Sequence, residues 1–165
     1  MRMKFWFGEE IRYVKETKCW HIWNGQRWVE DLAGTEVTRM ATKISKHIFD
    51  EAAEINDGEA ARQLAAWGIA SCSHKHLTAM VSLAKAQEGI AVSINDFDLQ
   101  PDLLNCRNGV VDLATGKRMP HCSDLMMTKM VPVDFVPEAE CPIRLKFLHR
   151  VEFYPATSSP ISGFE

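Results

Sequence analysis

The chain has 165 residues, and its 19 Lys and Arg residues against 22 Asp and Glu residues give a formal net charge of −3. Apolar residues make up 46% and charged residues 25% of the sequence, a composition typical of a globular domain that excludes a disordered chain. No apolar run approaches the roughly 20 residues that span a bilayer, and residues 1–8 lack the apolar core of a signal peptide. We therefore expect a cytoplasmic protein with one domain over residues 1–151 and a frayed tail over residues 152–165.

Several common site motifs are missing from the sequence. It contains no G-x-x-x-x-G-K-[ST] phosphate loop, so no P-loop motor is expected within it. The number of cysteines is odd and their spacing is irregular, which argues against a disulfide framework and a Cys-x-x-Cys zinc site; they are Cys19, Cys72, Cys106, Cys122 and Cys141. The serines also lack the context of a nucleophile elbow. We expect no catalytic residue, no metal site and no cofactor in this chain.

The first third of the chain predicts an antiparallel β-meander over residues 10–31, because aromatic and β-branched residues alternate there with turn signals. Asn24-Gly25 is typical of a two-residue type I′ hairpin turn, with residues 26–29 as the return strand. Thr17-Lys18 indicates a weaker turn between the first two strands. A small three-stranded sheet is the expected result.

The middle of the chain predicts three helices. Apolar residues over 34–56 recur at three- and four-residue steps and define one helical face, which consists of Val37, Ala41, Ile44, Ile48, Ala52 and Ile55. Asp57-Gly58 ends this helix, and residues 59–70 and 74–87 predict two further helices. Gly89 is a stop signal for the last of them.

The chain changes character after Gly89. Residues 90–94 predict a short strand, residues 95–108 a turn-rich stretch, and residues 109–113 and 117–120 two strands around the turn Ala114-Thr115-Gly116. Residues 127–135 predict an edge strand, since Pro132 cannot donate to a ladder. Residues 142–151, which begin with Pro142, predict a last helix. The predicted class is α+β: an N-terminal antiparallel β-meander, central helices, a β-hairpin region and a C-terminal helix.

The meander combines tryptophans with basic residues, which allows two interpretations. The indoles could form a platform on which the bases of a single strand stack, or they could be the small core that such a sheet needs; the core interpretation is favoured. If nucleic acid binds here, the expected contact residues are Arg12, Lys15, Lys18, Trp20, Trp23, Arg27 and Trp28. The near-neutral net charge favours a solvated surface of mixed charge over a dedicated nucleic-acid face.

Two clusters of potential ligands are weaker candidates. Cys72, His74 and His76 could suggest zinc, but their spacing is poor for one helix face and no second ligand pair follows at a standard distance. The carboxylates Asp96, Asp98, Asp102 and Asp112 more often build turns in such a stretch than a catalytic or metal cluster. A metal-dependent enzyme built on Asp96, Asp98 and His121 is therefore the weakest hypothesis.

A recognisable pattern runs from residue 96 to residue 142. It contains F-D at 97–98, L-L-N-C-R-N-G-V-V-D-L-A-T-G at 103–116, H-C-S-D at 121–124 and A-E-C-P at 139–142, and W-N-G-Q-R-W-V-E-D stands upstream at 23–31. Over roughly residues 10–151 this resembles the D5 N-terminal-like domain of P4-type phage and plasmid primase–helicases, which also occurs in poxvirus relatives. The resemblance implies that the motif residues matter, and our reading of them as mainly structural singles out Phe97, Asp98, Asn105, Asn108, Gly109, Asp112, Gly116, His121, Asp124, Cys141 and Pro142.

The resemblance implies a non-catalytic linker or collar module between a primase domain and a superfamily 3 helicase motor. Such a module would support oligomerisation and DNA handling, while ATP and Mg²⁺ would act only in the motor, beyond this sequence. The implied partners are DNA, single- or double-stranded, the motor and primase domains, and further copies of the chain. The alternative from the residues alone is an independent single-stranded nucleic-acid-binding module that uses the basic, Trp-rich meander.

Overall fold

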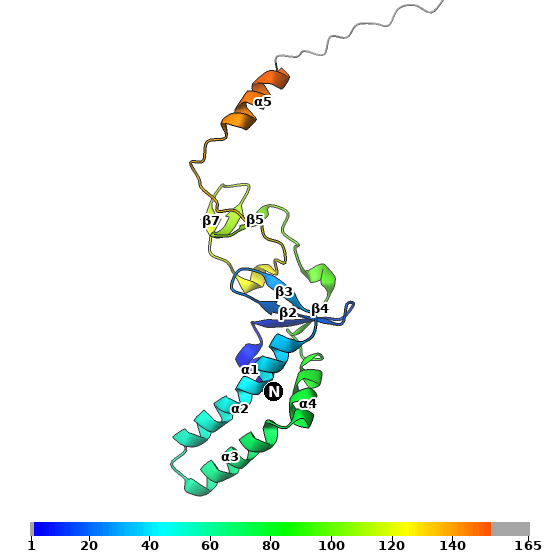
Figure 1. Cartoon of the computed structure of the whole chain (residues 1–165), viewed down its shortest axis with the longest axis vertical. Helices are drawn as coiled ribbons and strands as arrows, with labels where there is room; N and C mark the ends of the chain where they lie inside the picture. Colours follow the sequence, from blue (N-terminus) through cyan, green and yellow to red (C-terminus); the bar gives the residue numbers. More distant parts are fainter. Residues whose placement is uncertain (1, 153–165) are drawn as a thin grey trace, which may run out of the picture. The chain divides into compact units, whose positions relative to one another are not determined.

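The computed structural model describes residues 2–152, and the chain divides into two compact units, Met1–Phe135 and Val136–Glu165. The first unit begins with helix α1 (Arg2–Phe7) and contains two small sheets and three longer helices (Figure 1). The second unit contains helix α5 (Pro142–Glu152), which confirms the predicted last helix. The predicted α+β class is confirmed. The predicted tail lies outside the described residues, apart from the last residue of α5.

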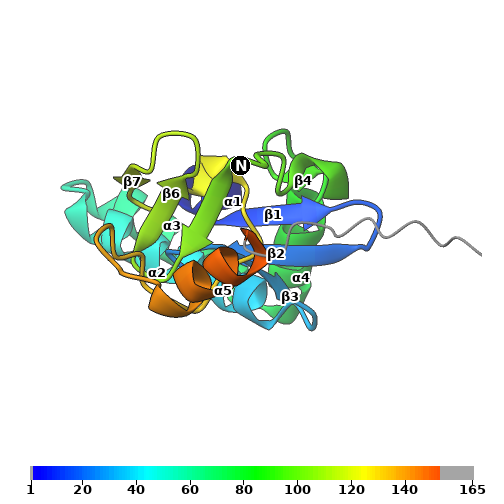
Figure 2. The same cartoon turned by 90° about the horizontal axis from the view of Figure 1, so that it is seen from above.

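The first sheet has the strand order β3-β2-β1-β4. Strands β1 (Ile11–Val14), β2 (Cys19–Trp23) and β3 (Trp28–Asp31) pair antiparallel as the predicted meander, and they run alongside one another in Figure 2. Strand β4 (Ala91–Val92) joins β1 in parallel, with Tyr13 opposite Ala91. Parallel pairing needs a long connection between strands, and the three central helices, which lie between β3 and β4 in the sequence, provide it.

The turn between β2 and β3 differs from the predicted type I′ turn. The return strand begins at Trp28, so a four-residue loop joins Trp23 to Trp28. The Asn24 side-chain Oδ1 accepts hydrogen bonds from the amides of Gln26 and Arg27 at 3.0 and 2.9 Å. This side-chain bonding closes a longer turn, which sequence alone did not distinguish from the two-residue form.

The core lies between the first sheet and the helices α2 (Thr35–Glu54), α3 (Gly58–Ser71) and α4 (His74–Ala84). The predicted apolar face of α2 is buried except at its end, since Ile55 lies beyond the helix and is 37% exposed. Asp57 caps α3 by accepting a hydrogen bond from the Glu59 amide at 3.0 Å. The sequence thus predicted the helix correctly because its signal is local, although α2 ends at Glu54, two residues before the predicted end.

Helix α1 was not predicted from the sequence. Met3 and Phe7 are buried in the core with α2, whereas Phe5 is 81% exposed. Six residues are too few for periodicity to distinguish a helix from an apolar strand, and such a short helix is marginal without tertiary packing. Packing of its two inward residues therefore accounts for this element.

The second sheet has the order β5-β6-β7. Strands β6 (Gly109–Asp112) and β7 (Arg118–Met119) confirm the predicted pair around the turn at 114–116. Residues 95–108 were predicted only as a turn-rich stretch, and the structure places strand β5 (Leu103–Cys106) within it. Its pairing with β6 overrides the turn propensity of the Asp- and Pro-containing residues that precede it.

The predicted strand over residues 127–135 is wrong. Residues 126–135, here called the strap, have no regular secondary structure and make one isolated bridge to the sheet, between Val131 and Cys106. The Val131 amide donates to the Asn105 carbonyl at 2.8 Å, and the Arg107 amide donates to the Val133 carbonyl at 2.9 Å. Pro132 stands between these two bonds and cannot donate, so a regular ladder does not form.

Candidate functional site

Two of the three meander tryptophans are core residues. Trp20 is 4% exposed and belongs to the core beneath the helices, while Trp28 is 1% exposed and packs on the other face of the sheet with Val14 and Phe97. Trp23 is partly buried, and its ring centroid lies 5.8 Å from that of Trp28. Trp20 and Trp28 therefore present no open ring face to a nucleobase, which favours the core interpretation.

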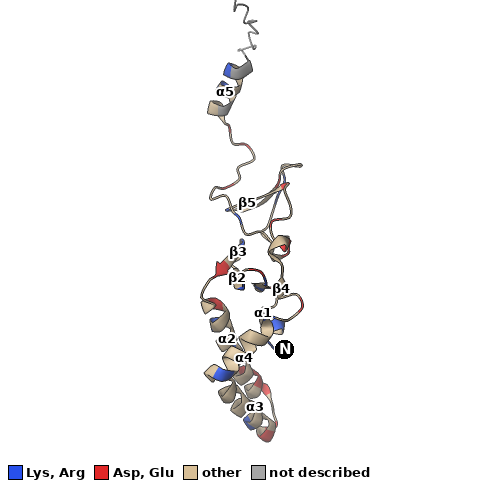
Figure 3. Cartoon of the chain, turned by 90° about the vertical axis from the view of Figure 1, so that its right-hand side faces the viewer, with Lys and Arg blue, Asp and Glu red and all other residues tan. Residues whose placement is uncertain are grey.

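The predicted basic residues of the meander fall into two groups. The Arg12 guanidinium lies 4.7 Å from the Trp28 ring centroid and donates to the carbonyls of Gly8 and Ile11; burial lowers its pKa. Arg27 donates to the Thr128 carbonyl at 3.2 Å. Lys15 and Lys18 are exposed. Acidic and basic residues are interspersed along the elements in Figure 3, and nucleic-acid binding by these residues stays a prediction.

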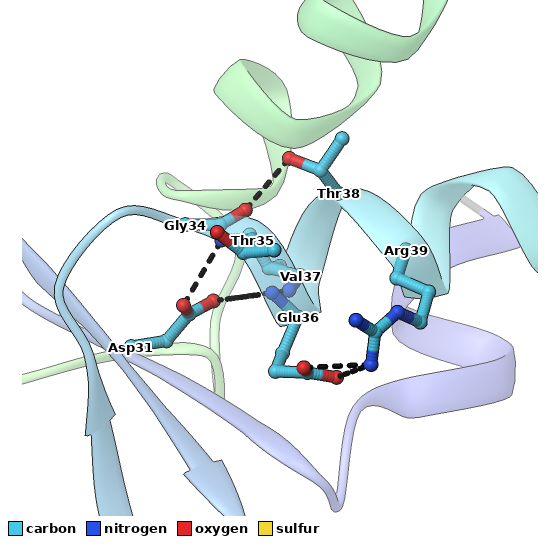
Figure 4. Close-up of polar contacts among 7 residues, drawn as sticks. All are labelled: Asp31, Gly34, Thr35, Glu36, Val37, Thr38 and Arg39. Atoms are coloured by element: carbon cyan, nitrogen blue, oxygen red, sulfur yellow. Dashed lines mark hydrogen bonds and ion pairs between the residues drawn. The ribbon is translucent and has the colours of Figure 1, made fainter.

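Asp31, which ends the motif segment at 23–31, caps helix α2 (Figure 4). Gly34 occupies the N-cap position with φ +66° and has no side chain to bond the free amides of the first turn. The Asp31 carboxylate accepts from the amides of Thr35 and Glu36 at 2.9 Å and from that of Val37 at 3.1 Å. Three unpaired donors at the positive end of the helix dipole are thereby satisfied.

Replacing Asp31 with alanine is expected to lower the free energy of unfolding by about 1–2 kcal/mol, because three amides lose their acceptor. Asp31→Asn keeps one acceptor oxygen but loses the charge and the second acceptor, so its cost should be smaller than that of the alanine variant, about 1 kcal/mol. Urea unfolding followed by circular dichroism measures both. Equal stability of the alanine variant and the parent chain would contradict the capping role.

Asn105 joins three segments of the first unit. It is 2% exposed, and its side-chain amide donates to the carbonyls of Gln26 at 3.0 Å and Lys129 at 3.1 Å. These contacts connect β5 with the β2–β3 loop and with the strap. The Oδ1 atom of Asn105 is buried with no partner among the described residues. This motif residue therefore fixes the mutual positions of the meander and the second sheet.

Other motif residues hold the two ends of the strap. Asp98 accepts from the amide and the hydroxyl of Thr128, and Asn108 exchanges two hydrogen bonds with the backbone of Phe135 at 2.9 and 3.0 Å. Arg107 donates to the Pro132 carbonyl at 2.8 Å between these ends. The side chains thus replace the missing ladder bonds of a segment that contains proline.

Motif residues in the second sheet and beside it have similar contacts. The Asp112 carboxylate accepts from the amides of Ala114 and Thr115, and hydrogen bonding by Thr115 is the largest of the effects that lower its pKa. His121 Nε2 lies 2.9 Å from the Cys106 carbonyl oxygen. Gly109 and Gly116 have φ angles of +145° and +68°. These residues shape turns and strand ends.

The remaining motif positions are spread between the units. Phe97 is 7% exposed in the smaller core cluster, and Asp124 is exposed. In the second unit, the exposed Cys141 accepts the Leu145 amide at 3.1 Å through its carbonyl, and Pro142 begins α5. The structure therefore brings Asp98, Asn105 and Asn108 together around the strap and leaves the others at separate turns.

The strap borders a pocket of about 290 Å³. Its polar lining includes Asp98, Asn105 and Lys129, and the rest is largely apolar: Leu103, Leu104, Met127, Met130 and Val131. Lys129 lies 3.9 Å from the Asp98 carboxylate, which already binds Thr128. The side chains of Asp98 and Asn105 bind the backbone of Thr128 and Lys129, so the polar groups at this pocket hold the strap in place.

The two candidate ligand clusters are engaged in local contacts. His76 Nδ1 lies 2.9 Å from the Ala70 carbonyl and 2.7 Å from the Ser73 hydroxyl. The Asp96 carboxylate accepts from the Ser93 amide at 2.7 Å in a capping box, away from the Thr128 contact of Asp98. Within residues 2–152, no three His, Cys, Asp or Glu side chains converge in a way that could hold a metal ion. No helix in this range has the length and apolar character to cross a membrane.

His21 is a buried titratable group in the meander. It is 7% exposed, its ring lies 5.1 Å from that of Phe97, and Arg12 and Glu30 stand opposite it on the neighbouring strands. Burial lowers its pKa from the ordinary value of 6.5, against a smaller opposing effect of Glu30. The folded state therefore favours the neutral ring.

This burial predicts a pH-dependent stability. As the pH falls through 6.5 the unfolded chain takes up the His21 proton first, so the free energy of unfolding should decrease, and it should recover above 6.5. Urea unfolding at a series of pH values between about 5 and 8 measures the effect. In the His21→Gln variant this step should be smaller. An unchanged pH profile in the variant would assign the dependence to other groups.

Sequence comparisons place the chain in a family. None of the curated proteins matches it. The family model described as D5 N terminal like matches residues 1–151, which covers both sheets, all the central helices and the motif residues around the strap. This domain is found in phage and plasmid primase–helicases. The chain therefore belongs to the D5 N terminal like family.

Proposed function

We propose that the chain is a non-catalytic linker or collar module of a phage or plasmid replication primase–helicase. In this role it supports oligomerisation and DNA handling beside a superfamily 3 ATPase motor, where ATP and Mg²⁺ act. The observation that carries the proposal is the family match over residues 1–151, together with motif side chains that bind backbone around the strap. A linker or collar needs a rigid arrangement of its segments, and hydrogen bonds from these side chains to the backbone supply one.

Exposed apolar residues support the assembly role in each unit taken separately. Phe5 is 81% and Trp6 38% exposed on α1, and Trp6 stacks on His47 with ring centroids 4.0 Å apart. In the second unit, Ile143 is 82% and Phe147 63% exposed on α5. Large apolar side chains of this kind, when several gather, are typical of protein–protein contact surfaces.

Light scattering of the full chain over a range of concentrations tests the assembly role. We expect species larger than a monomer that dissociate on dilution. The double variant Ile143→Asp/Phe147→Asp should shift the equilibrium towards monomer, whereas the matched control Leu113→Asp, at a 56% exposed apolar residue of the hairpin turn, should not. A chain that stays monomeric and also fails to bind a superfamily 3 motor in pull-down would overturn the proposal.

The alternative, an independent nucleic-acid-binding module that uses the meander, loses its stacking platform because Trp20 and Trp28 are buried. Arg12 and Arg27 are engaged with backbone carbonyls, which leaves Lys15 and Lys18 as the exposed cations of that set. DNA handling by this chain therefore calls for a different contact surface.

A further inference from the structure

Two grooves adjoin each other where the start of α2 lies beside α4, a pair of helices in direct contact (Figure 1). One groove, of about 270 Å³, is lined mainly by α4; the other, of about 250 Å³, extends to the end of β3 and the start of β2. They share Thr38, Val81 and Lys85. These two adjoining grooves are together called the α2–α4 groove.

The charge that the α2–α4 groove offers to a ligand is positive. Its charged lining residues are Lys18, Lys85 and Asp31, with His74 at one end. Both carboxylate oxygens of Asp31 accept amides of the α2 first turn, so the helix N-terminus compensates this negative charge. Neither lysine forms an ion pair within residues 2–152. The groove is therefore suited to an anionic ligand.

The two lysines reach the groove from different elements. The Lys85 ammonium lies 5.1 Å from the Tyr13 ring centroid, a cation–π distance that keeps it on the sheet side of the groove. Lys18 stands in the β1–β2 turn with φ +57°, immediately before β2. Lys18 thus comes from a turn and Lys85 from the end of a helix, and both line the groove that extends to β2 and β3.

The rest of the groove combines hydroxyl groups with apolar surface. Thr78 and Ser82 follow His74 at four-residue steps, so these polar side chains lie on one face of α4. Leu77 and Val81 add apolar surface beside them, and Thr38 faces them from α2. A single strand offers phosphates and unstacked base faces together, whereas a duplex keeps its base faces within the stack.

We propose that the α2–α4 groove binds single-stranded nucleic acid through its phosphate backbone, with Lys18 and Lys85 as the phosphate contacts. This inference rests on the DNA-handling part of the proposed function and assigns it to a surface. Of the nucleic-acid contacts predicted from the sequence, this site includes Lys18. Residues of α4 take the place of the tryptophans as the expected contact surface. The backbone contacts carry no base specificity, so binding should tolerate different sequences.

Fluorescence anisotropy of the full chain with a labelled oligothymidylate of about 12 nucleotides tests the proposal. The logarithm of the affinity should fall linearly with the logarithm of the salt concentration. The double variant Lys18→Gln/Lys85→Gln should reduce that slope by about 1.4, since each phosphate contact on a single strand contributes about 0.7. The corresponding loss of affinity at 0.15 M salt is roughly tenfold.

The matched control is Lys43→Gln/Lys117→Gln, which removes two exposed lysines that line neither groove. The control should change the slope and the affinity much less than the groove variant. Equal losses in both variants, no binding by the parent chain, or equal affinity for duplex of the same length would each overturn the proposal. Stronger binding of an acidic peptide such as oligoglutamate than of the oligonucleotide would assign the groove to a protein partner instead.

Light scattering on the same samples separates this inference from the collar function. The groove variant should assemble as the parent chain does, because neither lysine lies on α1 or α5. A chain that binds the oligonucleotide through the groove but stays monomeric would retain the groove and contradict the assembly role. A chain that assembles without binding the oligonucleotide would contradict the groove alone.

Discussion

Replacing Gly109 with alanine is expected to lower the free energy of unfolding by about 3–5 kcal/mol, the largest effect we anticipate for a single substitution. Gly109 begins β6 with φ +145°, a conformation that side-chain-bearing residues rarely adopt. A Cβ atom there would lie 2.6 Å from the Met119 carbonyl oxygen and 3.0 Å from Arg118 Cγ. The methyl group would therefore meet strand β7 as well as strain its own backbone.

Gly116→Ala provides the matched control for Gly109→Ala. Gly116 also has a positive φ, +68°, but a Cβ atom added there has no heavy atom within 4 Å. It should cost only about 1–2 kcal/mol, the backbone penalty of the left-handed region. Urea unfolding at fixed pH gives both values. Similar losses at the two glycines would show that contact with β7 contributes nothing.

Replacing Asn105 with alanine is expected to cost about 2–4 kcal/mol, because two carbonyl groups lose their donor at a buried site. The affected carbonyls belong to Gln26 and Lys129, so the β2–β3 loop and the strap should both loosen. Hydrogen exchange of the amides around residues 126–135 measures this local effect, and urea unfolding measures the global one. The exposed Asn108 serves as control, since Asn108→Ala should cost only about 1 kcal/mol.

Asn105→Asp separates hydrogen bonding from side-chain size. The introduced carboxylate has the shape of the amide but places a negative charge against two carbonyl oxygens, so its pKa should be raised in the folded state. The variant should therefore be least stable at neutral pH and should regain stability as the pH falls, because the protonated acid can donate again. A pH-independent loss equal to that of Asn105→Ala would contradict the donor role of this side chain.

The elements that the sequence identified are those whose signals are local. The apolar spacing from Val37 to Ala52 defined α2, and Asp57-Gly58 defined its end, because periodicity and capping depend on neighbours within a few residues. The alternating strands of the meander followed in the same way. The capping residue Asp31 was missed because it lies four residues before the helix, outside the usual N-cap position.

The motif residues illustrate where sequence reasoning about the site stopped. The family resemblance identified Asp98, Asn105 and Asn108, and the turn chemistry of Asp and Asn suggested a structural role for them. Their partners Thr128, Lys129 and Phe135 are 24 to 30 residues away in the chain. No periodicity or spacing connects residues at such distances, so these contacts to the strap could not be predicted from the sequence.

The α+β class, the longer helices, the three-stranded meander and the family could all be predicted from the amino-acid sequence, since these follow from local propensity, periodicity and motif. Three features became visible only in the folded chain: Trp20 and Trp28 face two cores, β5 pairs with β6, and Lys18 and Lys85 line the same groove. These features escape sequence reasoning because burial, strand pairing and surface charge depend on which distant segments come together. The direction in which a side chain points is therefore settled only when its neighbours are in place.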